Sequence, residues 1–246
     1  MVISIIALLI SLLLPALGGA MRAAQSVACL SNLHQLGLGD SLYAEAYHGA
    51  HFTAYEVVNQ PGGGQLTSGW PTLLNPYITT GLDSNNGRNQ DSINSVYTCP
   101  SAYNPHYPPG SSLDQYLLTY GVNCNVHTWG NPDYASTPAR TLVYITQIRR
   151  PSEIIDFADC AQSSGVWTCA GWISATDSAA YGGWYNAQSM ADLPLPILGN
   201  ADVAGGLYGI RYRHDRQNAT NVVFCDGHAT TARIGTLLYR NISNSY

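Results

Sequence analysis

The hydrophobic pattern divides the chain near residue 50. Val2 to Ala20 is an apolar run without a charged residue, and as a helix of about 1.5 Å per residue it nearly crosses a hydrocarbon core of about 30 Å. No proline follows between Met21 and about His48, which predicts that the helix continues. We therefore expect one long helix over residues 1–50, membrane-compatible over 1–20 and amphipathic over 21–50.

The amphipathic part has two apolar faces. One face comprises Cys29, Leu33, Leu36, Tyr43 and Tyr47, and the other comprises Ala23, Val27, Leu38 and Leu42. A helix that covers a single core carries one apolar stripe, so the second face predicts a second partner. A solvated linker behind a membrane anchor is the alternative. Gly37 and Gly39 each weaken helix propensity by up to about 1 kcal/mol, which indicates local melting or close packing.

The apolar run fits three kinds of segment: a secretory signal peptide, a plain membrane anchor, or a helix that is first embedded in a membrane and later in a protein assembly. Pro15 removes a backbone hydrogen bond and predicts a kink. The small residues from Gly18 to Ala20 resemble a signal-peptide cleavage site, but the run lacks the positively charged region with which such peptides normally open.

Residues 51–246 form the predicted head. Glycine, proline, asparagine and serine punctuate it, and the segment from Gly62 to Gly110 is expected to be mostly irregular. Alternating apolar residues predict an antiparallel sheet from the strands Thr141–Thr146, Glu153–Phe157, Gly209–Arg213, Asn221–Cys225 and Ala229–Ile234. Asp226-Gly227 predicts a type I′ hairpin turn. His214 and His228 are expected to flank that hairpin as hydrogen-bonded residues, with a metal site as the alternative.

Composition narrows the function. Charged residues make up 10% of the chain, against about 25% in a typical soluble protein. The formal net charge is -5, and the sequence contains no cluster of basic residues. We therefore expect no nucleic-acid partner, because phosphate binding relies on clustered lysine and arginine. The six scattered cysteines are disulfide candidates in an oxidising compartment, with free buried thiols as the alternative, and Cys160 and Cys169 are near enough in sequence to close a short loop.

Five motifs occur in the order found in one bacterial family. They are CLSNLHQLGLGDSLYAEAYHG (Cys29–Gly49, after LLLPAL), YTCPSA (Tyr97–Ala102), YGVN (Tyr120–Asn123), RRPSEIIDFADC (Arg149–Cys160) and RHDRQNATNVVFCDGHA (Arg213–Ala229). With them, the chain resembles the type IV prepilin-like, or pseudopilin-like, proteins that carry a C-terminal His-x9-Asp-Gly signature and are abundant in planctomycete-type bacteria. The corresponding residues here are His214, Asp226 and Gly227, with a longer spacing than in the family pattern.

The resemblance implies an α+β, pilin-like fold, in which a long kinked helix packs on an antiparallel sheet with a loop-rich head. It assigns a filament core to the residues Ile5, Ile6, Leu9, Leu12, Leu13, Pro15, Leu17, Ala23, Val27, Leu38 and Leu42. The stripe that begins at Cys29 becomes the sheet's partner, with Cys29–Cys99 as a helix-to-head disulfide. Cys160–Cys169 and Cys124–Cys225 are the other candidate pairs. Aligning Pro15 with the family's proline places Met1 inside the family helix, so the family's processing site and docking glutamate have no counterpart here.

Other candidate chemistry is sparse. Asp83, Asn85, Gly87, Asn89 and Asp91 resemble the opening of a calcium loop, but Asn94 stands where the loop's final glutamate belongs, so a plain turn is preferred and no cofactor is expected. The histidines His34, His48, His51, His106 and His127 show no ligand spacing. No nucleophile elbow or nucleotide loop occurs, so we expect no enzyme activity.

The predicted function is assembly. We expect a structural subunit of an extracellular type IV pilus-like or pseudopilus filament, with copies of itself and the pilus or secretion assembly machinery as partners. Its predicted localisation is the inner membrane before assembly and the cell surface afterwards. The alternative is an exported soluble or membrane-anchored binding protein, with the aromatic residues Trp167, Trp172 and Trp184 as a candidate surface for carbohydrate.

Overall fold

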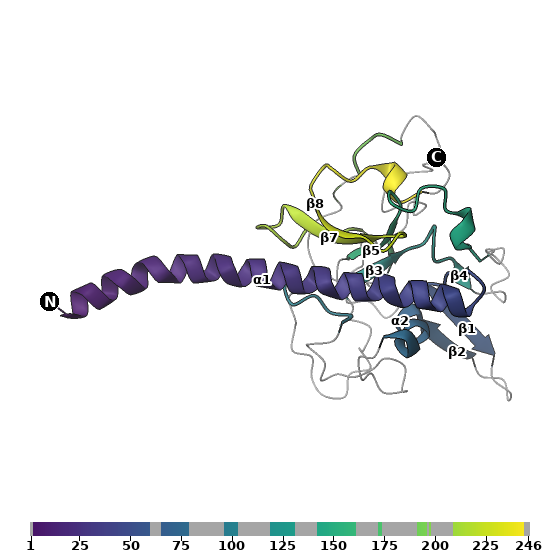
Figure 1. Ribbon diagram of the computed structural model, residues 1–246, viewed down its shortest axis with the longest axis horizontal. Helices are drawn as coiled ribbons and strands as arrows, with labels where there is room; N and C mark the ends of the chain where they lie inside the picture. The colour runs from purple at the N-terminus through teal and green to yellow at the C-terminus, as the bar shows by residue number, and fades with distance from the viewer. Residues whose placement is uncertain are drawn as a thin grey trace.

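The protein has an α+β, pilin-like layout in which one long helix carries a sheet-containing head (Figure 1). The computed structural model describes residues 2–59, 65–78, 96–102, 119–130, 142–160, 172–173, 191–195, 197 and 209–243. The N-terminal part of the helix projects away from the head, and its C-terminal part lies against the head. The short helices are α2 (Trp70–Leu74), η1 (Asn75–Tyr77), η3 (Ile145–Gln147) and η5 (Tyr239–Asn241).

The long helix, α1 (Val2–Ala46), runs through Pro15 without interruption. Its exposed part curves gently in Figure 1, and a sharp kink at Pro15 stays a prediction. It ends close to the predicted position because His48 and Gly49 adopt positive φ angles of 56° and 87°, and the Gly49 amide donates to the Ala44 carbonyl at 2.7 Å. A left-handed residue after the last turn is a common helix stop.

The head contains a five-stranded sheet. Its strands, in spatial order, are β6 (Trp172–Ile173), β3 (Tyr120–Asn123), β5 (Ile155–Asp159), β7 (Ala219–Phe224) and β8 (Ala229–Arg233). The neighbours from β3 to β8 are antiparallel, whereas β6 is parallel to β3. A smaller sheet has the order β2 (Gln65–Gly69), β1 (Tyr55–Asn59), β4 (Trp129–Gly130). Strands β1 and β2 form an antiparallel hairpin. Strand β2 and helix α2 lie within Gly62–Gly110, the segment expected to be mostly irregular, so that prediction is wrong for these residues.

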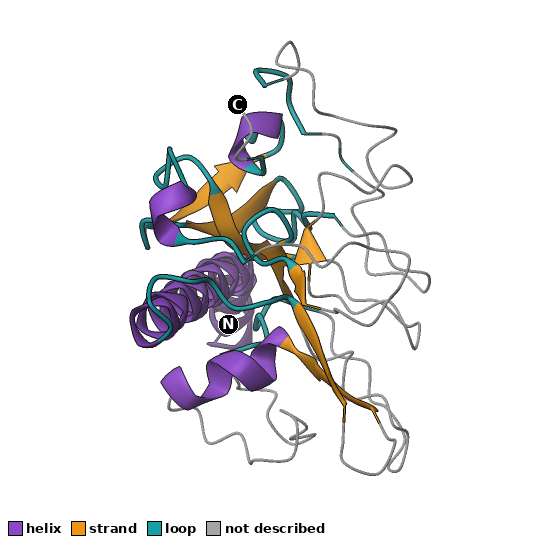
Figure 2. Cartoon of the chain, turned by 90° about the vertical axis from the view of Figure 1, so that its right-hand side faces the viewer, coloured by secondary structure: helices purple, strands orange, loops and turns teal. Residues whose placement is uncertain are grey.

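The two faces of the main sheet have different partners. Figure 2 shows α1 on one side of the strands. On this side, Leu33 and Leu36 of the helix join Trp70, Phe157 and Val223 in one buried cluster. On the other side, the C-terminal segment supplies a second cluster with the β5 and β7 residues; its members include Ile155, Val222, Tyr239 and Ile242. Because β5 and β7 are covered on both faces, all of their residues are buried.

Two of the predicted strands are replaced by isolated bridges. Among the described residues, Tyr144 forms a single bridge with Ala50 before the chain enters η3, and Ile210 forms a single bridge with Cys160 at the end of β5. The apolar run around Tyr144 stays at the surface, where Leu142 and Ile145 are exposed, and no second strand among the described residues completes a ladder with it. The other three predicted strands overlap β5, β7 and β8.

The predicted hairpin is present, but its turn differs from the predicted type. Only Gly227 has a positive φ, of 87°, and Asp226 does not, whereas a type I′ turn needs positive φ at both central residues. The Gly227 amide donates to the Phe224 carbonyl at 2.8 Å. This arrangement is typical of the longer hairpin loop in which a glycine follows the turn and forms a bulge.

Close packing explains both helix glycines, and the helix does not melt there. A Cβ atom added at Gly37 lies 2.9 Å from Val223 Cγ2, and one added at Gly39 lies 2.8 Å from Ile78 Cγ1. The helix backbone therefore approaches the strand and the η1 region more closely than any side chain allows.

We expect Gly39→Ala to lower the free energy of unfolding by about 1 kcal/mol. Overpacking costs about 1–3 kcal/mol, and the better helix propensity of alanine returns at most about 1 kcal/mol. Denaturant unfolding of the detergent-solubilised chain measures the change. Gly19→Ala is the matched control, because no atom lies within 4 Å of its added Cβ. Equal stability of the Gly39 variant and the wild-type chain would contradict the close approach.

Candidate functional site

The largest exposed apolar surface among the described residues is the first part of α1. Its large aliphatic side chains are between 49% and 82% exposed; they are Val2, Ile3, Ile5, Ile6, Leu8, Leu9, Ile10, Leu12, Leu13, Leu14 and Leu17. This helix is long and apolar enough to cross a membrane, as a membrane anchor or a signal sequence would. Contiguous apolar surface of this extent is typical of a membrane or protein interface.

The apolar surface continues along the side of α1 that faces away from the head. Ala23 is exposed, and Val27, Leu38 and Leu42 are exposed by 66%, 54% and 41%. The opposite stripe has the predicted contacts with the head at Cys29, Leu33, Leu36 and Tyr43. Tyr47 is less buried than predicted, at 52% exposed. It stacks on Tyr43 with ring centroids 4.3 Å apart, and its side chain hydrogen-bonds with Tyr77 of η1.

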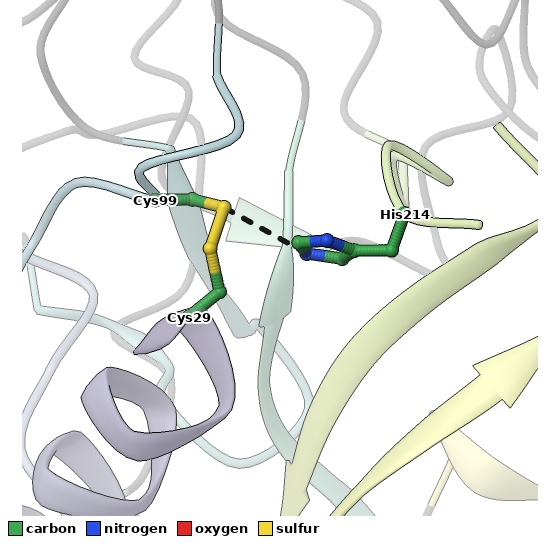
Figure 3. Close-up of side chains that lie close together, drawn as sticks. All are labelled: Cys29, Cys99 and His214. Atoms are coloured by element: carbon green, nitrogen blue, oxygen red, sulfur yellow. Dashed lines mark hydrogen bonds between the residues drawn. A yellow bond between two sulfur atoms is a disulfide. The ribbon is translucent and has the colours of Figure 1, made fainter. Parts of the chain in front are cut away.

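A disulfide ties the helix to the head. Cys29 of α1 and Cys99 are joined with Cα atoms 5.0 Å apart, which is the predicted pair (Figure 3). Cys124 and Cys225 are not bonded to each other, so the predicted Cys124–Cys225 pair is wrong. They pack in different apolar clusters, Cys124 beneath α1 and Cys225 beside Ile154. The third predicted pair involves Cys169, which lies outside the described residues.

His214 lies beside the disulfide and not at the hairpin mouth. It bridges Ala219 at the start of β7, and its ring points toward the Cys99 sulfur, with Nε2 3.7 Å from that atom (Figure 3). The same nitrogen is 3.0 Å from Asp159 Oδ2, which also accepts the Asn221 amide at 2.8 Å. The length of β7 separates His214 from Asp226, so a metal site that combines these residues is ruled out by the structure.

The turn residues Asp226 and Gly227 form a local structure of their own. Asp226 Oδ1 accepts from the His228 amide at 3.1 Å and contacts His228 Nδ1 at 2.6 Å. Burial alone would raise the pKa of Asp226, but the hydrogen bonds from His228 lower it. This exposed pair stabilises the turn, in agreement with the preferred sequence interpretation.

A second group of polar side chains is fully buried where the C-terminal part of α1 meets the sheet. It contains Asp40 of α1, His51 after the helix, His127 after β3, and Asp156 of β5. His51 Nδ1 lies 2.6 Å from Asp40 Oδ2, and His127 Nε2 lies 2.5 Å from Asp156 Oδ1. One ligand atom from each residue lies within 4.8 Å of the others. We call these four residues the buried His–Asp cluster.

Burial dominates the electrostatics of the His–Asp cluster. It raises the pKa of Asp156 to about 7 and lowers the pKa of His127 to about 4. Burial also raises the pKa of Asp40, and the negative charge of Asp156 raises it further. Burial opposes the charge on His51, but its contacts with Asp40 raise its pKa overall. Two carboxyl groups and two imidazoles thus share a space that disfavours any net charge.

Two atoms of the His–Asp cluster have no hydrogen-bond partner. They are Asp40 Oδ1 and His51 Nε2, both of which are buried. An unsatisfied buried polar group costs about 1–3 kcal/mol, so the hydrogen bonds within the cluster do not fully offset the cost of burying its polar atoms. Sequence reasoning missed this cluster because its histidines lie far apart along the chain. The available signal was Asp40, a charged residue within the apolar stripe between Leu36 and Tyr43.

Two other predicted features fall outside the described residues: the calcium-loop residues from Asp83 to Asp91, and Trp167 and Trp184. Comparisons with protein-family models, with curated proteins and with solved structures found no match to this chain.

Proposed function

We propose that this protein is a structural, non-enzymatic subunit of a type IV pilus-like or pseudopilus filament. The observation that supports this function is the position of the exposed apolar surface. It covers the projecting part of α1 and then continues past the start of the head, through Val27, Leu38 and Leu42, on the side away from the sheet. A plain membrane anchor needs only the projecting part, whereas a helix bundle uses both.

The physical basis of assembly is a change of surroundings for one surface. The apolar helix is first buried in the inner membrane and then against the α1 helices of neighbouring subunits, with the assembly machinery moving it between the two. A single interface that is repeated head to tail without closing builds a helical filament. The head stays outside the bundle, and the Cys29–Cys99 disulfide keeps it attached to the helix during transfer.

The alternative is an exported or membrane-anchored binding protein. A released protein would be cleaved near Ala20 and would lose the apolar run, whereas a filament subunit retains it. Mass spectrometry of the mature N-terminus separates the two. A chain that starts near Met21 would contradict the filament proposal.

Leu38→Arg tests the proposal directly. Because Leu38 faces away from the head, we expect the head to keep its stability while the yield of surface filaments falls by about tenfold, which corresponds to about 1.4 kcal/mol per interface. Electron microscopy and immunoblotting of sheared filaments measure the yield. Leu38→Met is the control, because it keeps the apolar character of this position and adds no charge. Wild-type filament yield in the Leu38 variant would contradict a role for this face.

A further inference from the structure

The buried His–Asp cluster has the composition of a closed metal site. We propose that Asp40, His51, His127 and Asp156 bind one divalent transition-metal ion, with zinc as the best match, and that this ion fastens the end of α1 to the sheet. Nothing in this inference depends on filament assembly.

The geometry supports a single four-coordinate ion. Zinc binds histidine nitrogen and carboxylate oxygen at about 2.0–2.2 Å, so four tetrahedral ligand atoms lie about 3.3–3.6 Å from one another. The ligand atoms of the cluster lie within 4.8 Å of one another, and the two His–Asp contacts of 2.6 and 2.5 Å are shorter than the tetrahedral spacing. Small side-chain shifts therefore convert the paired arrangement into a coordinated one.

The orientation of His127 is also that of a metal ligand. Its Nδ1 is 3.1 Å from the Phe52 carbonyl oxygen, to which it donates a hydrogen bond, and its ring stacks on Phe52 with centroids 3.9 Å apart. A backbone carbonyl that accepts a hydrogen bond from Nδ1–H keeps the proton on Nδ1 and leaves the Nε2 lone pair for a cation, as is usual for metal-bound histidine. That Nε2 atom is the one that faces Asp156.

Charge balance also supports a divalent ion at this site. Two ionised aspartates and two neutral histidines carry two negative charges, and a divalent ion makes the buried group neutral. It also gives a reason for the unpartnered polar atoms of Asp40 and His51, which in an ordinary buried network would have partners. Because all four residues are almost completely shielded from solvent, the site has no open position for substrate and is structural.

The location explains what such an ion would do. Asp40 and Cys29 lie on the buried stripe of α1, about 16 Å apart along the helix axis. The disulfide fixes one end of the docked segment, and the metal site would fix the other by joining α1 to β5 and to the turn after β3. The head and the docked part of the helix would then move as one body.

The test is the metal content and thermal stability of the full-length protein in detergent. We expect about one zinc ion per chain by elemental analysis, a lower melting temperature after chelation, and recovery when zinc is added. His127→Gln and Asp156→Asn should lose the ion and the response to zinc. His34→Gln, at an exposed histidine of α1, should retain both.

Cobalt provides a second measurement that does not depend on the stability of any variant. Wild-type protein that has been stripped and reloaded with Co²⁺ should show the visible absorption of a four-coordinate nitrogen and oxygen site. The proposal is overturned if zinc-supplemented wild-type protein holds far less than one ion per chain and its melting temperature is the same with zinc and with chelator. It is also overturned if His127→Gln and Asp156→Asn retain the ion, because the ion then binds elsewhere.

Discussion

Leu9→Arg is expected to deplete the chain from the membrane fraction by at least about a hundredfold. An arginine near the centre of a membrane-spanning helix costs about 2.5–3.5 kcal/mol, the favourable contribution of leucine is lost as well, and each 1.4 kcal/mol is a factor of ten. Leu9 is 55% exposed on the projecting part of α1, so the head loses no contact. Cell fractionation with immunoblotting measures the membrane-bound share.

The same substitution should abolish filaments. In a helix bundle, the arginine would be a buried charge without a partner, which is strongly destabilising. Leu9→Ile is the control, because it keeps the apolar character and adds no charge. Normal membrane association of the arginine variant would show that the apolar run is not the anchor, and normal filament yield would remove it from the assembly interface.

Removal of the disulfide is the second large effect. In the Cys29→Ala/Cys99→Ala double variant, we expect the free energy of unfolding to fall by about 2–5 kcal/mol, because the bond closes a loop with a sequence separation of 70 and restricts the unfolded chain. The loss should appear as a lower denaturant midpoint, since that midpoint reports stability. In cells, we expect the variant to be degraded or to form fewer filaments.

Reductant serves as an internal control for the disulfide prediction. It should destabilise the wild-type chain by about as much as the double substitution and should leave the double variant unchanged. A similar loss in the double variant on reduction would point to another disulfide. If the wild-type chain is equally stable with and without reductant, the helix is held by packing and hydrogen bonds alone, such as the one that the Asn221 side-chain Nδ2 donates to the Ser26 carbonyl at 3.0 Å.

Local periodicity was sufficient for the helix and for much of the sheet. The apolar residues from Cys29 to Tyr43 recur at helical spacing, so they fall on one face of a helix, and that face is buried. The runs that form β5, β7 and β8 each have a neighbouring strand to pair with. The run around Tyr144 has an equally apolar sequence, but in the described part of the chain it pairs only through a bridge to Ala50. Strand formation depends on that neighbour, which sequence does not reveal.

The sequence by itself determined the long apolar helix, its two faces and the Asp-Gly hairpin, because these features follow from residues close together along the chain. Only the tertiary structure decided that Gly37 and Gly39 mark close packing, that His214 contacts Asp159, and that Asp40, His51, His127 and Asp156 meet. Those contacts join segments that are far apart in sequence, and their formation depends on how the sheet docks on the helix, which no local pattern encodes.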